Sequence, residues 1–186
     1  MKLELLRLLR EKSYEYREHP FTLKSGMTSN HYVDCRPVTF SGIGKLFIGL
    51  VLLEMVKDLN ISAVGGKTIG ADPIANAISF ASTIDPSVPL SQIIDSFSIR
   101  DKPKKHGKKG QLVGPVQKGD RVVVVEDVIT TGGSTIEALS ILGENEIEVI
   151  QVIPLVDREE GGRETIESLG FKVNPVFRMS ELWRSQ

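Results

Sequence analysis

Four consecutive valines at residues 122–125 constrain the fold more than any other part of this sequence. β-Branched residues favour strands, and a strand that is apolar at successive positions is buried on both of its faces. Such strands belong to parallel sheets that helices cover on both sides, so the sequence predicts an α/β fold. A chain of 186 residues has the length of one such domain with a sizeable core.

Hydrophobic periodicity elsewhere predicts the other elements of this domain. Near the N-terminus, the leucines of residues 3–9 predict a helix that ends before His19 and Pro20, because a residue before proline avoids the α region. The segment 21–36 reads as strand, loop and strand. Further helices are expected at 43–59, 72–82, 134–142 and just before Gly170, and strands at 64–66, 90–94, 121–126, 148–155 and 172–177. With no repeat and no linker, residues 1–186 are expected to form a single domain.

Residues 98–120 break this alternation, because they are poor in apolar side chains and rich in cations, glycine and proline. They are predicted to form a long loop. Long loops within compact domains are uncommon and are often functional lids, although a solvated basic turn would have the same composition.

Charge and cysteine usage exclude several classes of protein. The net charge is −1, which gives no sign of nucleic-acid binding. The single cysteine, Cys35, cannot form a disulfide within the chain and is expected to be an inert, half-buried thiol in a reducing compartment. The N-terminal segment carries charges throughout, and the longest apolar run, residues 46–53, is too short to cross a bilayer. A cytoplasmic protein without membrane contacts is therefore expected.

The segment TTGGS at residues 130–134 follows the valine strand and precedes a predicted helix. Backbone N–H groups at the start of a helix are unpaired and lie at the positive end of its dipole, so a glycine-rich turn there can bind a phosphate. The hydroxyls of this segment could add hydrogen bonds. A tight turn in which Ser134 is an ordinary N-cap remains the alternative.

Glu126 and Asp127 lie directly before this turn and would repel a phosphate unless something separated them from it. A ribose 5-phosphate fits this arrangement, because its vicinal hydroxyls can donate to the two acids while its phosphate lies on the glycine turn. The position also agrees with the rule that ligands of open α/β sheets bind beyond the carboxyl ends of the strands. The Gly-Lys-Ser/Thr of a Walker A loop is missing.

The sequence VVVVEDVITTGGS at residues 122–134 closely resembles the signature with which type I phosphoribosyltransferases bind phosphoribosyl diphosphate (PRPP). The resemblance implies a central, mostly parallel sheet flanked by helices, with a small N-terminal hood formed mainly by residues 1–40. It also implies that Glu126 and Asp127 bind the ribose hydroxyls. The implied 5'-phosphate site consists of Thr130, Thr131, Gly132, Gly133 and Ser134.

Three further segments are similar to the orotate phosphoribosyltransferases in particular. FTLKSGMTSNHYVD at 21–34 resembles the hood of that family, which implies that Lys24 reaches the active site and that Tyr32 lies near the base. LVDREEGGRE at 155–164 resembles the strand end at which an arginine approaches the substrate. Arg158 would then pair with the orotate carboxylate, whereas taken alone it could form a surface salt bridge with Glu159 or Glu160.

IRDKPKKHGKKG at 99–110 resembles the mobile catalytic loop of the same family. The resemblance implies that Arg100, Lys104 and His106 bind the diphosphate of PRPP, although a lone histidine in a loop usually has no such role. Asp101 stands where the family usually has lysine. VGGKTIGADPIANA at 64–77 is similar to the diphosphate loop, but Lys67 lies earlier than the lysine of other members and is assigned no role.

The implied reaction transfers the phosphoribosyl group from PRPP to orotate, giving orotidine 5'-monophosphate and diphosphate in de novo pyrimidine biosynthesis. Lys24, Arg100, Lys104 and His106 would be catalytic, and Lys24, Tyr32, Thr130 and Arg158 would contact orotate. Mg²⁺ is the expected cofactor, carried mainly by PRPP oxygens and not by protein ligands. The resemblance also implies a homodimer whose subunits share the catalytic loop.

Two other functions stay open at this point. A phosphoribosyltransferase for another base, such as xanthine, would share residues 126–134 but would not need Lys24 or Arg158. A noncatalytic PRPP-sensing regulator would keep the sugar-phosphate site and would tolerate Asp101, yet it would have less reason to retain Arg100, Lys104 and His106.

Overall fold

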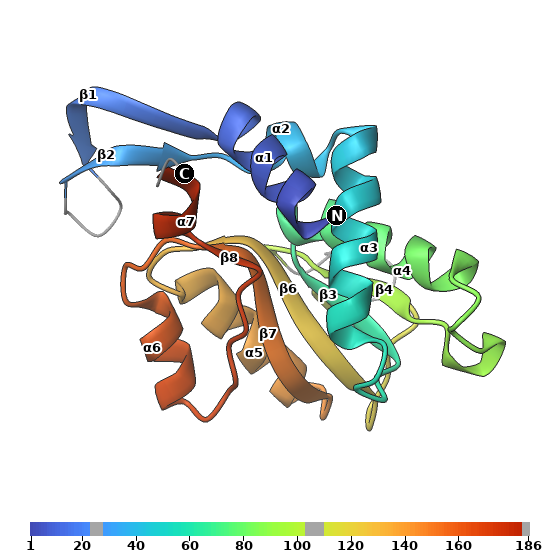
Figure 1. The fold of residues 1–186 in the computed structure, drawn as a ribbon. Coiled ribbons are helices and arrows are strands. Elements are labelled where there is room, and N and C mark those ends of the chain that lie inside the picture. The colour runs from blue at the N-terminus through green and yellow to red at the C-terminus, as the bar shows by residue number, and fades with distance from the viewer. Residues whose placement is uncertain (23–27, 103–109, 184–186) are drawn as a thin grey trace.

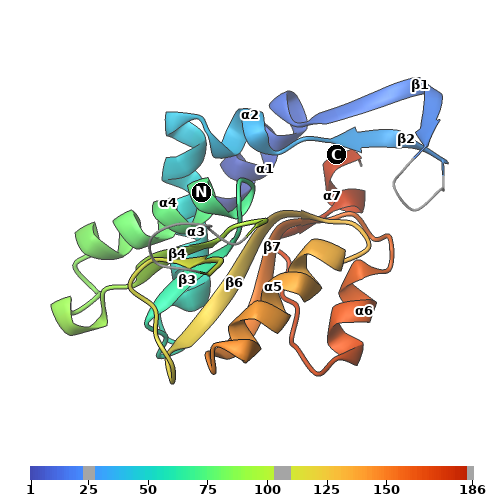
Figure 2. The ribbon, with the colours of Figure 1, turned by 180° about the vertical axis from the view of Figure 1, so that it is seen from behind.

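The computed structural model describes residues 1–22, 28–102 and 110–183 and has a central sheet covered by helices on both faces (Figure 1; Figure 2). The sheet has the strand order β5-β4-β3-β6-β7-β8. All neighbouring strands are parallel except β5, which is antiparallel to β4. The strands are β3 (Ala63–Lys67), β4 (Asp95–Ile99), β5 (Leu112–Val113), β6 (Arg121–Ile129), β7 (Glu148–Asp157) and β8 (Phe177–Arg178).

The valines of β6 divide between two hydrophobic cores, as their position in the middle of the sheet requires. Val123 and Val125 pack in the core under α1 (Lys2–Lys12), α3 (Gly42–Val56) and α4 (Ala71–Ile84). Val122 and Val124 pack on the opposite face, under α5 (Gly133–Glu144) and α6 (Gly162–Ser168). Successive side chains of a strand point to opposite faces, so four buried valines in a row mean that both faces are covered. The predicted α/β class, with a mostly parallel sheet, is confirmed.

A two-stranded hairpin lies apart from this sheet. β1 (Tyr14–Thr22) and β2 (Thr28–Val33) are antiparallel and project beyond the body of the molecule (Figure 1). The ring of His31 lies 5.3 Å from that of Trp183 in α7 (Met179–Trp183), which ties the hairpin to the C-terminal part of the chain. A short helix, α2 (Arg36–Thr39), leads from β2 into α3.

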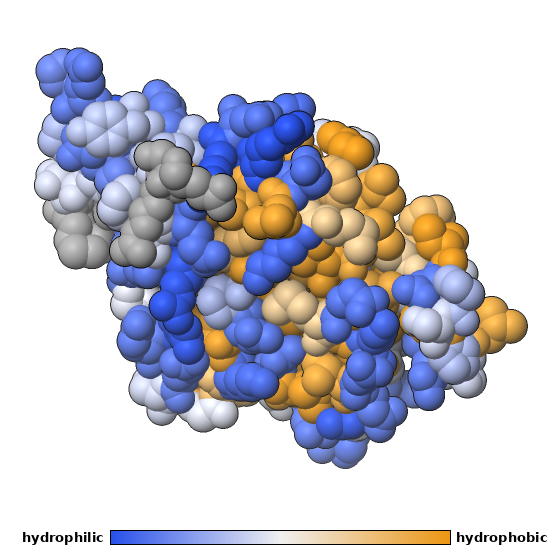
Figure 3. Space-filling model, viewed as in Figure 1, coloured by the Kyte–Doolittle hydropathy of each residue, from blue (hydrophilic) through white to orange (hydrophobic). Residues whose placement is uncertain are grey.

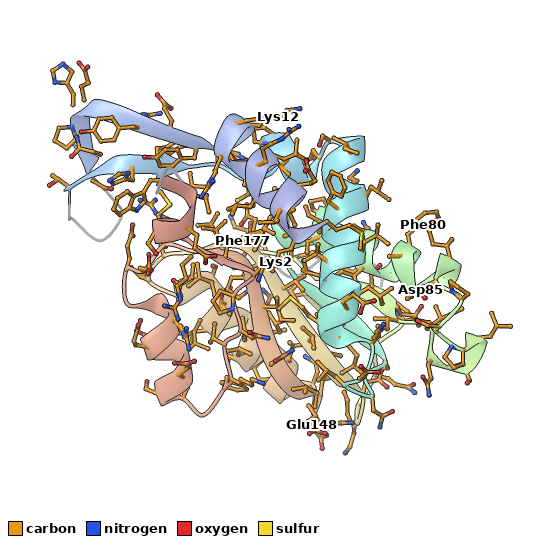
Figure 4. All side chains as sticks on the ribbon, in the orientation of Figure 1. Lys2, Lys12, Phe80, Asp85, Glu148 and Phe177 are labelled. Carbon is orange, nitrogen blue, oxygen red and sulfur yellow. The ribbon has the colours of Figure 1, made fainter. Side chains whose placement is uncertain are left out.

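The N-terminal helix is part of the main core. Leu5 and Leu9 are fully buried there. The ammonium of Lys2 lies 5.4 Å from the ring centre of Phe177, at the start of β8, and Figure 4 shows the two side chains together. The helix therefore packs across the strand that ends the sheet.

Several predicted elements were wrong in their bounds. The first helix ends at Lys12, and the residues up to Pro20 belong to β1, because Tyr14 and Tyr16 pair with β2. Residues 90–92 form a 3-10 turn, and the strand begins only at Asp95, where pairing with Ala63 becomes possible. Strand β8 is limited to two residues, preceded by one isolated bridge at Val173.

The predicted loop at 98–120 also contains regular structure. β4 continues through Ile99, and Leu112 pairs with it from the short strand β5. Arg100 and Gln111 exchange two hydrogen bonds of 2.9 Å, from the Arg100 amide to the Gln111 carbonyl and from the Gln111 side chain back to the Arg100 carbonyl. Residues 103–109 lie outside the described part of the chain. Among the described residues, no helix is long and apolar enough to cross a membrane.

Candidate active site

The acid pair lies inside strand β6, near its carboxyl end. The strand was predicted to end at Glu126, but it continues to Ile129, since Val128 and Ile129 still pair with β7. Glu126 is 7% exposed and accepts hydrogen bonds from the Asp127 amide at 3.2 Å and the Ser134 hydroxyl at 3.3 Å. Ser134 therefore contacts the acid pair, and it is not the N-cap of α5, a position that Gly132 takes.

Burial raises the pKa of Glu126 to about 8, and the neighbouring charge of Asp127 adds to the effect. A carboxylate withdrawn from water loses hydration that its hydrogen bonds only partly replace, and a like charge next to it disfavours ionisation further. Without a ligand, the side chain is thus mostly protonated at neutral pH. A partner that donates hydrogen bonds to the carboxylate would favour its charged form.

The turn between β6 and α5 leaves backbone donors open. Gly132 has φ +83°, which favours glycine, and a Cβ at this position would lie 3.0 Å from the Gly162 carbonyl. The Ile136 amide donates to the Gly132 carbonyl at 2.9 Å and forms the first turn of the helix. The amides of Gly133, Ser134 and Thr135 precede that bond and have no acceptor within the helix, so they can bind an anion.

One cavity of about 380 Å³ brings six of the ten described candidate residues together at the carboxyl edge of the sheet. Arg100, Thr131, Gly132 and Gly133 are not in its wall, although the last three lie in the adjoining turn. Lys24, Lys104 and His106 lie outside the described residues. The candidates that line the cavity are Tyr32, Glu126, Asp127, Thr130, Ser134 and Arg158.

Arg158 enters the cavity from the end of β7 with its side chain 7% exposed. Its Nη2 lies 2.8 Å from Glu160 Oε1 and donates to the His31 carbonyl at 3.1 Å. The salt bridge with Glu160 that the sequence left open therefore exists, but it is buried and not on the surface. Arg158 Nε is buried without a hydrogen-bond partner within the described part of the chain, so the guanidinium has donor capacity left.

Several residues in the cavity wall were not predicted as site residues. Asp34 binds the guanidinium of Arg36 through both carboxylate oxygens, each at 2.8 Å. Gly70 packs against the acid pair, since a Cβ there would lie 2.6 Å from Asp127 Oδ1 and 3.0 Å from Glu126 Oε1. Both lie in segments whose resemblance was noted from the sequence, 21–34 and 64–77, but neither residue was assigned a role there.

Cys35 and Thr135 complete this part of the site. Cys35 is fully buried and not half-buried, and burial raises the pKa of its thiol well above the ordinary value. A thiol of this kind is a poor nucleophile at neutral pH, as the sequence led us to expect. The hydroxyl of Thr135 is buried without a hydrogen-bond partner among the described residues, directly after the glycine turn.

The carboxylate oxygens of the site could hold a hard cation such as Mg²⁺ only together with ligand oxygens from a bound substrate. Within the described ranges, no three His, Cys, Asp or Glu side chains gather closely enough to hold a metal ion. Glu126 and Asp127 together offer carboxylate oxygens at the cavity wall. Mg²⁺ typically takes one or two carboxylates and completes its octahedron with water and phosphate oxygens, so these residues fit an ion that arrives with a phosphorylated ligand.

A second, larger cavity of about 580 Å³ lies at the amino edge of the sheet, where Ser62 precedes β3 and Arg121 begins β6. It contains neither the acid pair nor the glycine turn. Ligands of parallel sheets bind at the carboxyl edge, so the smaller cavity is the better candidate.

Known proteins that resemble this chain in sequence and those that resemble it in structure belong to one family. Residues 70–176 match the phosphoribosyl transferase domain family. The chain is 45% identical to the orotate phosphoribosyltransferase of Aquifex aeolicus over 96% of both chains. It is 38% identical to that of Pyrococcus horikoshii over 100% of this chain and 95% of the relative.

Solved structures agree with these matches. The Mycobacterium tuberculosis orotate phosphoribosyltransferase in complex with Fe(III) dicitrate superimposes with a TM-score of 0.80 at 34% identity, over 98% of this chain and 99% of that one. The same enzyme in complex with PRPP has a TM-score of 0.77, over 97% and 98% of the two chains.

Proposed function

The chain belongs to the orotate phosphoribosyltransferases, the pentosyltransferases of pyrimidine biosynthesis, and from this premise we propose how its cavity binds and joins the two substrates. The observation that carries the proposal is that the acid pair, the glycine turn and Arg158 meet at one cavity. These are the groups that a sugar, a phosphate and a planar carboxylate would each require.

The ribose 5-phosphate of PRPP binds between β6 and α5. Its two ring hydroxyls donate to Glu126 and Asp127, and its phosphate accepts from the amides of residues 131–134 and from the hydroxyls of Thr130, Thr131 and Ser134. Since hydrogen bonds to a carboxylate favour its ionised form, the ribose itself promotes ionisation of Glu126. The acid pair therefore binds the ribose hydroxyls more favourably than the water that they displace.

Orotate binds on the other side of the ribose, near the hairpin. Arg158 pairs with its carboxylate, and Glu160 holds the guanidinium in place. Tyr32 lines the same cavity and contacts the flat ring of the base. Thr130 contacts the base from the residue that follows β6, and Lys24, which lies outside the described residues, is proposed to contact the base as well.

In the reaction, a ring nitrogen of orotate loses its proton and forms a bond to C1 of the ribose while the bond from C1 to the diphosphate oxygen breaks. The departing diphosphate can accept that proton. The electron pair of the broken bond leaves with the diphosphate, so cations near the leaving group stabilise the transition state. Arg100 supplies one such charge, and Lys104 and His106 supply others from the segment outside the described residues. When bound, Mg²⁺ adds positive charge to the same oxygens. No covalent nucleophile is needed.

An orotate assay with base competition tests this proposal. Purified protein with PRPP and Mg²⁺ should consume orotate, followed by its ultraviolet absorbance, and a chelator should stop the consumption. Excess xanthine or adenine should not compete. Consumption of another base in place of orotate would assign the same cavity to a different transferase, and binding of PRPP without turnover would indicate a sensor.

The apolar surface over α3 and α4 is suited to bind a second copy of the chain. A groove of about 290 Å³ lies between α3 and α4, lined mostly by apolar residues such as Leu46, Leu50 and Ala77. Phe80 is 66% exposed and projects outward from α4 (Figure 4), and Figure 3 shows apolar residues gathered over these helices. Contiguous apolar patches of this kind mark interfaces. We propose that a homodimer forms there, with the catalytic loop shared between subunits.

Phe80→Glu is expected to weaken the dimer, because it places a charge in an apolar interface. Sedimentation equilibrium of the full chain should show dimers for the natural protein and mainly monomers for the variant at the same micromolar concentration. Leu169→Glu serves as the matched control, since Leu169 is also an exposed apolar residue but lies at the end of α6. Equal association of all three proteins would exclude this face as the interface.

The proposed compartment is the cytoplasm. A single, fully buried cysteine suits a reducing environment, where thiols stay free.

A further inference from the structure

Lys67, the last residue of β3, has a nearly buried ammonium in the wall of the substrate cavity. The side chain is 11% exposed. Its Nζ donates to Glu137 Oε2 at 2.6 Å and lies 3.1 Å from Asp101 Oδ1. The two carboxylates come from α5 and from the end of β4, so three elements that are far apart in the sequence converge on this one cation.

The two partners keep the ammonium charged in a place where a lone cation would be costly. Burial alone lowers the pKa of a lysine, but the hydrogen bond to Glu137 and the contact with Asp101 raise the pKa of Lys67 above its ordinary value. Both carboxylates are more exposed than the lysine, at 71% for Asp101 and 50% for Glu137. Two partners also leave one of the three N–H donors of the ammonium for a ligand.

The strand order places Lys67 and Arg158 on opposite sides of the acid pair. β6, which carries Glu126 and Asp127, lies between β3, which ends at Lys67, and β7, which ends beside Arg158. A ribose centred on the acid pair therefore has one cation on each side. If the base is bound on the β7 side by Arg158, the group that leaves C1 lies toward β3.

On the β3 side of the cavity, a bound diphosphate would face several acidic side chains, so a cation is required there to offset their repulsion. Asp101 lines this side as well, and with the acid pair it brings three carboxyl groups to the wall that a diphosphate must approach. The other cations in the described wall come from other elements, Arg36 from α2 and Arg158 from the end of β7. Among the described residues of the wall, Lys67 is therefore the cation that lies on the β3 side.

We propose that Lys67 binds the diphosphate of PRPP, and that Asp101 and Glu137 are positioning residues that hold its ammonium at the cavity wall. The inference rests on the proposed function, because it takes PRPP as the ligand. It also explains Asp101, which stands where the resemblance has lysine: the positive charge comes from β3, and the loop supplies its counter-ion. A lysine at position 101 would then lie about as close to Lys67 as Asp101 does now, and two like charges at that distance repel.

Steady-state kinetics of a variant at position 67 test whether Lys67 binds the diphosphate. Lys67→Met is expected to raise the KM for PRPP by roughly 10- to 100-fold, since a charge-assisted hydrogen bond is lost, and to change the KM for orotate by less than about 3-fold. Lys57→Met is the matched control, because Lys57 forms a similar pair with Glu54 at 2.8 Å but lies at the amino edge of the sheet. A PRPP KM within about 2-fold of the natural protein would overturn the assignment.

Variants of Asp101 test the positioning role. Asp101→Asn should raise the PRPP KM less than Lys67→Met does, Asp101→Glu should restore most of it, and the double variant Lys67→Met/Asp101→Asn should be no worse than Lys67→Met alone. Asp101→Lys should lower kcat/KM. An increase in kcat/KM for Asp101→Lys, or fully additive effects in the double variant, would contradict the proposal.

Calorimetric titration of the protein with Mg²⁺ and diphosphate separates this inference from the proposed function. Lys67→Met should weaken diphosphate binding by about the same factor as it raises the PRPP KM. If the natural protein binds diphosphate but consumes no orotate, the proposed function fails while Lys67 is still tested. If diphosphate binds the Lys67→Met variant as well as the natural protein, the inference alone fails. Melting temperatures of each variant check that it is folded.

Discussion

Glu126→Gln is expected to lower kcat/KM for PRPP by about 100-fold or more while it raises the melting temperature of the free protein. The ribose loses hydrogen bonds to a charged acceptor, which accounts for the activity. The folded protein, however, no longer holds a carboxyl group in a buried place beside Asp127. A catalytic residue that destabilises its own fold is the signature of a site built for a ligand.

The gain in stability should depend on pH in a defined direction. The pKa of Glu126 is about 8 in the folded protein against an ordinary 4.5, so between these values the folded state binds more protons than the unfolded chain. The free energy of unfolding therefore falls as pH rises through this window. Glu126→Gln removes that slope, so its advantage should be small near pH 5 and reach the order of a few kcal/mol near pH 8.

Differential scanning calorimetry of both proteins across that pH range measures the effect. Glu148→Gln is a suitable control, because Glu148 is an exposed carboxylate at the amino end of β7 (Figure 4) and does not line the cavity. It should change neither activity nor the pH slope. A melting temperature that falls in Glu126→Gln, or a difference from the natural protein that stays constant with pH, would refute the buried acid as described.

Arg158→Ala is expected to raise the KM for orotate by about 100-fold and to change the KM for PRPP much less. A guanidinium binds a carboxylate through two parallel hydrogen bonds, and alanine leaves the substrate charge unpaired in a partly desolvated cavity. Arg158→Lys should recover only part of the loss, since an ammonium keeps the charge but not the planar fork. Steady-state kinetics with each substrate varied in turn measures both constants.

The removal of Arg158 also leaves Glu160 without its partner. Burial already raises the pKa of Glu160, and the charge of Arg158 opposes that shift, so Glu160 should become easier to protonate in the variant. Arg163→Ala is the control, because Arg163 forms an i,i+4 pair with Glu167 on the outside of α6. Equal increases in the two Michaelis constants of Arg158→Ala would mean that this arginine does not distinguish the base from the sugar.

Short sequence patterns predicted the central strand, the glycine turn and the acid pair, because the conformation of each depends on neighbouring residues in the chain. Four adjacent valines require a strand covered on both faces, and the structure divides them between two cores. A glycine turn between a strand and a helix produces unpaired amides, and Gly132 has the left-handed conformation that such a turn needs. The grouping of Glu126, Asp127 and Ser134 at one cavity follows from the same few residues.

The features that the sequence did not predict depend on contacts across long distances in the chain. Lys67, Asp101 and Glu137 meet only because β3 and β4 end, and α5 begins, at the same edge of the sheet. Tyr14 and Tyr16 lie in the segment that was predicted as helix, and their pairing with β2 makes that segment a strand. Ser134 was a plausible cap, yet its hydroxyl donates to Glu126 because Gly132 already begins the helix.

A crystal structure of the protein with Mg²⁺, PRPP and an unreactive analogue of orotate tests the central claim most directly. We expect the 5'-phosphate on the amides of residues 131–134, the ribose hydroxyls on Glu126 and Asp127, and the carboxylate of the analogue on Arg158. The diphosphate should lie on the β3 side of the acid pair. A sugar phosphate bound away from Glu126 and Asp127, for example in the cavity at the amino edge of the sheet, would contradict it.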